Sequence, residues 1–176
     1  MRTFSRFFLP VVLFMVIASG TAMAASDDIL GFWKQIDDKT QLPETLVYIY
    51  NYQGKLYGRM IISYEDNGAV KDTILVQKFK AEKLAGDPPY CGLDYVYQLE
   101  VKGKEYRGGI MDPRSGDDYT CVIKRDGEKL IVRGQLKGLG LFGRNQTWVR
   151  ASAADLPAGF AMPDPALFIP VLPKKK

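Results

Sequence analysis

Chemistry in this chain depends on carboxylates, tyrosines, lysines, arginines and two thiols, because the 176-residue sequence contains no histidine. The missing imidazole excludes Ser-His-Asp and Cys-His catalysis, histidine-ligated zinc or non-haem iron, and an imidazole general base. No paired set of the remaining types forms a recognisable catalytic constellation. We therefore expect no enzyme activity and no cofactor, with an enzyme that uses Tyr, Asp or Lys as a weaker alternative.

Three carboxylates, Asp112, Asp117 and Asp118, flank one short turn and could hold calcium or act in acid–base chemistry. Calcium requires six to eight oxygen ligands. Asp before Pro113, with Gly116 at the far end, is also typical of an ordinary hairpin turn in which the aspartate bonds nearby N–H groups. We therefore interpret the cluster as structural and predict no metal site.

Tyrosines are the best candidates for a ligand site. All ten lie between Tyr48 and Tyr119, and alternation places Tyr48, Tyr50 and Tyr52 on one face of a strand. Tyrosines suit a cavity for amphipathic ligands, but the same pattern fits a wet barrel exterior. Arginines in mid-strand must face water, a carboxylate or a ligand anion. The candidate ligand-binding residues are Tyr48, Tyr50, Arg59, Tyr97 and Arg107.

The first 24 residues have the pattern of a signal peptide. Arg2 and Arg6 precede an apolar run over 7–18, and the small residues Ala22-Met23-Ala24 follow. The apolar run is shorter than the about 20 residues that a membrane-spanning helix needs. We expect cleavage after Ala24 and a periplasmic protein. Secretion and an uncleaved anchor are the alternatives.

Export bears on the two cysteines and on the charge. In an oxidising compartment, Cys91 and Cys121 are expected to form a disulfide, with two separate thiols as the alternative. The 24 basic residues exceed the 20 acidic ones, but two arginines lie in the leader and three lysines, Lys174 to Lys176, end the chain. The excess therefore does not indicate a nucleic-acid partner.

The rest of the sequence predicts short strands joined by tight turns. The expected strands are 31–36, 45–52, 56–64, 93–101, 105–111, 119–125, 129–136 and 146–150. Glycine or asparagine in most of the connections is typical of an antiparallel meander. The stretch 72–89 is irregular, with one further strand or a short helix. After residue 151, five prolines alternate with apolar residues, which predicts an extended tail that packs on the barrel or on a partner.

The two ends of this meander carry a resemblance. Gly31 and Trp33 open the first strand, and Trp148 and Arg150 close the last. This arrangement resembles the lipocalin and wider calycin pattern, in which a tryptophan plugs the closed end of the barrel and an arginine lies across its indole. A guanidinium over an aromatic ring contributes about 0.5 to 2 kcal/mol.

A more specific motif runs through the segment 106–119, which contains Gly109, Asp112, Pro113, Gly116 and Tyr119. Together with a Leu-x-Val-Arg-Gly strand at 130–134 and the Gln-Thr-Trp at 146–148, it resembles the bacterial exported family DUF2147, from about residue 31 to 150. The resemblance implies a lipocalin-like barrel and no activity or cofactor. It does not cover the proline-rich tail.

These observations predict an all-β, antiparallel lipocalin-like barrel of about eight strands over residues 27–151, with a proline-rich C-terminal tail over 152–176. The expected function is non-catalytic binding of a small hydrophobic or amphipathic ligand, because a barrel of this size can hold one such molecule. The alternative is an envelope interaction protein whose barrel is filled and whose tail contacts a membrane surface or a partner protein.

Overall fold

The computed structural model describes residues 28–136 and 143–176, so the predicted signal peptide over 1–24 lies outside it. The described chain consists of nine strands and two short 3-10 helices. The strands are β1 (Gly31–Ile36), β2 (Pro43–Tyr52), β3 (Lys55–Tyr64), β4 (Val70–Thr73), β5 (Asp94–Lys102), β6 (Glu105–Asp112), β7 (Asp117–Asp126), β8 (Lys129–Gln135) and β9 (Gly143–Arg150), and the helices are η1 (Ala153–Asp155) and η2 (Pro165–Leu167).

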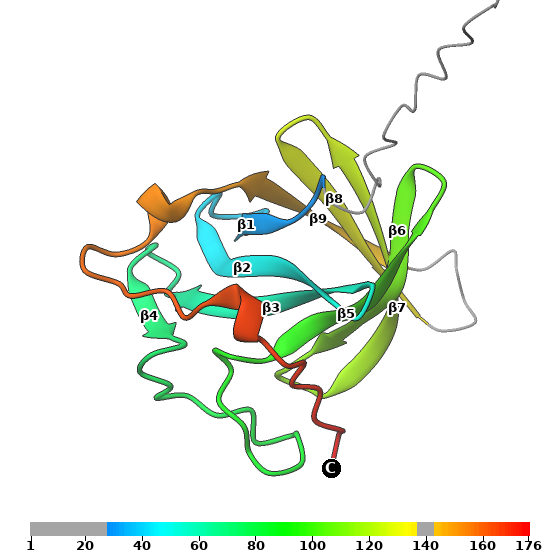
Figure 1. Ribbon diagram of the computed structural model, residues 1–176. Helices are drawn as coiled ribbons and strands as arrows, with labels where there is room; N and C mark the ends of the chain where they lie inside the picture. The colour runs from blue at the N-terminus through cyan, green and yellow to red at the C-terminus, as the bar shows by residue number, and fades with distance from the viewer. Residues whose placement is uncertain (1–27, 137–142) are drawn as a thin grey trace, which may run out of the picture.

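Eight of these strands form a closed antiparallel barrel (Figure 1). The order β2-β1-β9-β8-β7-β6-β5-β3 closes on itself because β2 also pairs with β3. Strand β4 pairs only with β3, outside the ring. The fold predicted from the sequence is confirmed, and the irregular stretch after residue 72 begins with the end of β4 and continues as turns and a bridge between Lys80 and Pro89.

One end of the barrel is filled by apolar side chains. Trp33 and Trp148 are fully buried there among aliphatic residues from the inward faces of the strands. The Trp33 indole donates to the carbonyl of Ile29 at 2.8 Å. Arg150 lies 4.7 Å from the centre of the Trp33 ring and donates to the carbonyl of Leu30 at 2.7 Å. The lipocalin-like closing arrangement inferred from the sequence is therefore present.

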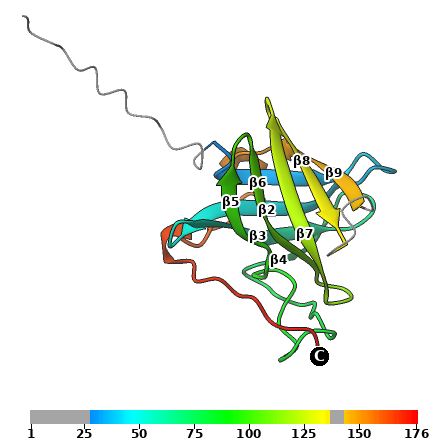
Figure 2. The ribbon, with the colours of Figure 1, turned by 90° about the vertical axis from the view of Figure 1, so that its right-hand side faces the viewer.

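The C-terminal tail covers the outer face of β2 and β3. Phe168 packs with Tyr50 and Tyr48 at ring-centre distances of 5.2 and 6.4 Å. Beyond it the tail runs past β5 to the loop before that strand, where Ala85 donates to the carbonyl of Lys174. Figures 1 and 2 show this path as the red segment leading to the C-terminus. The tail thus packs on its own barrel, and β2 and β3 are buried on both faces.

Two of the three terminal lysines are paired with acids of the barrel and its loops. Lys175 bonds to Asp117 at 2.7 Å, and Lys176 bonds to Asp87 at 2.6 Å. Leu84 forms a backbone bridge with Lys175. The last residues of the tail are therefore tied to the start of β7 and to the loop before β5.

The glycines of the 106–119 motif are explained by close packing. A Cβ on Gly108 would lie 2.6 Å from the carbonyl oxygen of Tyr97, and a Cβ on Gly109 would overlap the Tyr97 ring. Gly116 has a φ of +73°, and a Cβ there would meet Lys175 of the tail at 2.9 Å. These positions must stay small because another segment lies directly against the backbone.

The two cysteines are buried free thiols, so the disulfide expected from the sequence is absent. Cys121 lies on β7 opposite Gly108 of β6, and the neighbouring Gly109 pairs with Tyr97 of β5. Cys91 lies in the turn before β5. Cys91 and Cys121 thus lie in different elements, and both thiols are free in the structure.

No helix in the described ranges is long and apolar enough to cross a membrane. Within the same residues, no group of three or more Cys, Asp or Glu side chains could hold a metal ion.

Candidate functional site: a cavity at the open end of the barrel

The end of the barrel opposite the Trp33 plug contains a cavity of about 730 Å³. Its walls come from the end of β1 and the start of β2, the ends of β3, β6 and β8, and the starts of β5, β7 and β9, together with the loop before β5. A volume between about 300 and 1,000 Å³ is typical of small-molecule sites. The cavity at the open end therefore has the volume of a site for one small molecule.

The deeper wall of the cavity is mainly apolar. Met60 and Tyr95 belong to the buried core, and Ile110 packs against it from β6. Phe79 and Tyr90 extend the apolar surface outward along the loop before β5. Such a surface favours an aliphatic or aromatic group, because each Å² of apolar area removed from water contributes about 25 cal/mol.

A chain of polar contacts crosses the wall from Tyr95 to Glu44. The Tyr95 hydroxyl donates to Gln35 Oε1 at 3.1 Å, and Gln35 Nε2 donates to Glu44 Oε2 at 2.6 Å. Burial raises the pKa of Tyr95 well above its usual value, so the hydroxyl stays protonated and remains a donor. The Gln35 amide is thereby oriented with its oxygen inward and its nitrogen toward Glu44.

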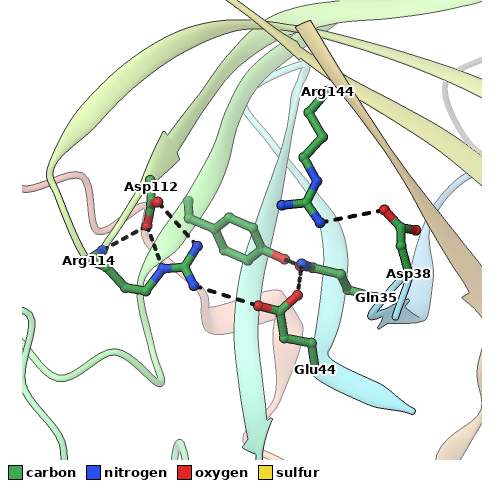
Figure 3. A network of polar contacts seen from close by, with 7 residues as sticks. Gln35, Asp38, Glu44, Asp112, Arg114 and Arg144 are labelled. Carbon is green, nitrogen blue, oxygen red and sulfur yellow. Dashed lines mark hydrogen bonds and ion pairs between the residues drawn. The ribbon is translucent and has the colours of Figure 1, made fainter. Parts of the chain in front are cut away.

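Arg114 extends from the β6–β7 turn toward β2 at the cavity mouth (Figure 3). Its Nε lies 3.1 Å from Asp112 Oδ1, and its Nη1 lies 3.9 Å from Glu44 Oε1. Asp112 also accepts the backbone N–H of Arg114 at 2.9 Å, which explains why this turn carries an aspartate before Pro113. The structure thus joins two sides of the mouth through one exposed guanidinium.

A second arginine stands at the same opening. Arg144 of β9 pairs with Asp38 of the β1–β2 turn at 3.5 Å, as Figure 3 also shows. Lys71 and Asp66 complete the charged lining. The lining contains acids and bases in similar number, so the mouth is polar without a large excess of either sign.

None of the five ligand-binding residues predicted from the sequence lines this cavity. Tyr48 and Tyr50 lie on the outer face of β2 under the tail, with Tyr52 beside them in the same cluster. Arg59 lies on the outer face of β3 beside Tyr50, 4.2 Å from the centre of the Phe168 ring. The sequence left both faces of the strands open for these side chains, and the structure places them on the outer face, where the tail buries them. They are therefore not ligand-binding residues of this cavity.

The other two candidates also lie outside the wall. Tyr97 covers Gly109 and its hydroxyl bonds to Asp118. Arg107 is exposed on β6 and pairs with Glu105 at 2.8 Å. Of the structural residues inferred from the resemblance, Asp112, Pro113 and Tyr119 do line the cavity, so the motif and the candidate site share one end of the barrel.

The tail is held by a buried network around Asp94, the residue that begins β5. Asp94 accepts from Arg59, from the Tyr50 hydroxyl at 2.9 Å and from the backbone N–H of Val171 at 2.7 Å. Burial raises the pKa of Asp94, while the bonds from Arg59, Val171 and Tyr50 oppose the rise. Tyr48, Tyr50 and Arg59 therefore hold the tail on the barrel, and the cavity is lined by other residues.

Sequence reasoning missed Gln35, Glu44, Met60, Tyr95 and Arg114 as cavity residues. Alternation along β2 offered one signal, since Thr45 lines the cavity while Leu46 and Tyr48 belong to the outer cluster. That signal identifies two faces but does not say which one is inside when both are apolar.

The closed barrel, plugged at one end and hollow at the other, defines a lipocalin-like protein. The chain belongs to the family described as "Uncharacterized protein conserved in bacteria (DUF2147)", whose model matches residues 31–150. The Helicobacter pylori protein HP1028, described as belonging to the lipocalin family, is similar to this chain. The two share 18% identity over 73% of this chain and 86% of that chain, with a TM-score of 0.57. At this identity the likeness shows the fold alone. No curated protein sequence matches the chain.

Proposed function

We propose that this protein binds one small amphipathic molecule, non-catalytically, in the cavity at the open end of its barrel. The observation that carries the proposal is a cavity of about 730 Å³ whose inner wall is apolar and whose mouth is charged. An apolar part of a ligand would contact Met60, Tyr95 and Ile110, and its polar end would remain near Arg114 and Arg144. Fixed polar groups around an apolar pocket are typical of sites that orient their ligand.

The state of two polar groups in the cavity wall favours binding over turnover. Among the described lining residues, Tyr95 is held protonated by burial, and the Arg114 guanidinium is occupied by Asp112 and Glu44. Neither provides a base near its operating pH, which general acid–base catalysis requires. We further propose that the protein acts in the periplasm, on the basis of the signal-peptide pattern at 1–24.

The test uses protein recovered from an exporting bacterial host, with its N-terminus read by mass spectrometry. Native mass spectra recorded before delipidation should show a bound small molecule. This molecule should be absent after delipidation and after denaturation. Delipidated protein is then titrated with dansyl-undecanoic acid, a fluorescent amphipath. We expect saturable fluorescence enhancement at one probe per chain.

A pair of matched variants locates the binding. Ile110→Trp fills the cavity and should weaken probe binding by about tenfold or more, which corresponds to about 1.4 kcal/mol. Ile131→Trp adds the same ring on the outward face of β8, where the neighbours Leu130 and Val132 point inward, and should leave affinity within about twofold. Equal binding by both variants, or no bound molecule and no probe signal, would overturn the proposal.

A further inference from the structure

The turn that follows β4 exposes apolar side chains beside the cavity mouth. Leu75 and Val76 are 52% and 55% exposed, and Phe79 is 43% exposed. Isolated exposed apolar residues are common, but three in five positions on one projecting turn form a local patch. In Figure 2 the segment between β4 and β5 projects beyond the barrel at the end where the β6–β7 turn lies.

This turn is rigidly built. Asp72 is buried, and its carboxylate accepts the backbone N–H groups of Thr73 at 2.8 Å and Phe79 at 3.0 Å. The N–H groups of Val76 and Gln77 both bond to the carbonyl of Thr73. The apolar tip is therefore presented by a fixed backbone, although its side chains contribute little to the core.

The charges around the tip have one dominant sign. Lys78, Lys80 and Lys83 are exposed and have no acidic partner among residues 28–136 and 143–176, whereas Glu82 is the only exposed acid in 74–83. By contrast, Lys71 on the cavity rim pairs with Glu65, and Lys175 and Lys176 at the chain end pair with Asp117 and Asp87. Unpaired lysines interleaved with exposed apolar groups match an anionic lipid surface, which attracts the ammonium groups and takes up the apolar ones.

We propose that residues 74–83 dock the protein on an anionic phospholipid surface, with the cavity mouth facing that surface. The patch is continuous with the cavity, because Phe79 and Lys71 line the opening and the Lys71 ammonium lies 5.1 Å from the centre of the Phe79 ring. A docked molecule would bring its cavity to the bilayer surface. The docking proposal does not depend on whether the cavity binds a ligand.

The experiment is co-sedimentation with vesicles of phosphatidylcholine alone or mixed with phosphatidylglycerol, using exported protein whose leader has been shown to be absent. The parent protein should bind the mixed vesicles and not the neutral ones, and salt should weaken the binding. Lys78→Glu with Lys80→Glu, and separately Leu75→Ser with Val76→Ser, should each reduce binding by about fivefold or more. None of these four residues lines the cavity, so dansyl-undecanoic acid binding should be unchanged.

Leu167→Ser with Ile169→Ser is the matched control. It removes two apolar side chains of the tail that are even more exposed, at 77% and 68%, and should leave vesicle binding within about twofold. Thermal melting confirms that each variant is folded. The proposal is overturned if the parent does not bind mixed vesicles, if the loop variants bind like the parent, or if the tail control loses binding as strongly as they do.

Discussion

Arg59 and Asp94 form a buried two-point ion pair between the barrel wall and the C-terminal tail. Arg59 Nη2 lies 2.6 Å from Asp94 Oδ2, and Nε lies 3.2 Å from Oδ1. Each partner also binds the tail backbone, since Arg59 donates to the carbonyl of Ile169 at 2.6 Å and Asp94 accepts the N–H of Val171 at 2.7 Å. The pair therefore couples β3, β5 and the tail in one network.

Breaking this pair should detach the tail and destabilise the barrel. Asp94→Asn leaves the Arg59 charge buried without its counter-ion, and we expect the free energy of unfolding to fall by about 3 kcal/mol or more. Arg107→Met is the control, because Arg107 pairs with Glu105 in an exposed position and its loss should cost less than about 1 kcal/mol. Urea unfolding measures both. Hydrogen exchange at Val171 should become fast only in Asp94→Asn, and a protected Val171 in that variant would contradict the role of Asp94.

A titration of free thiols in the unfolded protein should give two per chain. Burial raises the pKa of Cys91 to about 11 and that of Cys121 to about 12, so neither should react with Ellman's reagent in the native protein at neutral pH. In denaturant without reductant, both should react, because both thiols are free in the structure. A count of zero under these conditions would show that the cysteines are oxidised after export and would contradict the structure.

Gly109→Ala should destabilise the protein by about 1 to 3 kcal/mol, since the added methyl overlaps the Tyr97 ring and overpacking has a cost of that size. Combining it with Tyr97→Leu should cost less than the sum of the two single changes. Gly134→Ala is the control, with its nearest atom at an ordinary 3.5 Å. Additive effects at 109 and 97 would show that the ring does not require the glycine.

The start of the tail should respond to acid through Asp155. The hydrogen bond from Lys34 at 2.8 Å, followed by the backbone bond from Ser152, lowers the pKa of Asp155. A carboxyl with a lowered folded-state pKa stabilises above its unfolded pKa, near 3.9, and loses that contribution as pH falls through the folded value. Asp155→Asn should therefore lower stability at pH 7 by up to about 1 kcal/mol, and this loss should shrink at acidic pH, below the unfolded pKa of about 3.9. A loss that is equal at neutral and at acidic pH would point to packing instead of charge.

The sequence predicted the barrel because alternation and glycine-containing turns are local signals. All eight predicted strands occur, with ends shifted by a few residues at most, and the Gly31–Trp33 and Trp148–Arg150 pairs meet as the resemblance implied. The tail could be recognised from its composition. The surface on which the tail packs could not be predicted, because the tail is held by Arg59 and Asp94. These residues are far apart in the sequence, and no local pattern connects them.

The candidate site was harder to predict than the fold. Tyr48 and Tyr50 resembled a ligand-binding face because a strand buried on both sides shows apolar residues on both. Tyr95 and Gln35 became neighbours only through the closed ring, since their strands are far apart in the sequence. A cavity is formed by several strands together, so the sequence of any single strand does not predict it.

Closure of the ring has a consequence for how the chain assembles. The last strand seals the barrel against the first, and the contact of Arg150 with Leu30 joins residues 120 apart. The barrel therefore cannot close until nearly the whole chain is available, which makes its formation intrinsically slow. A chain interrupted before Gly143 would leave the edges of β1 and β8 open at once, and such fragments should pair with one another instead of remaining monomeric.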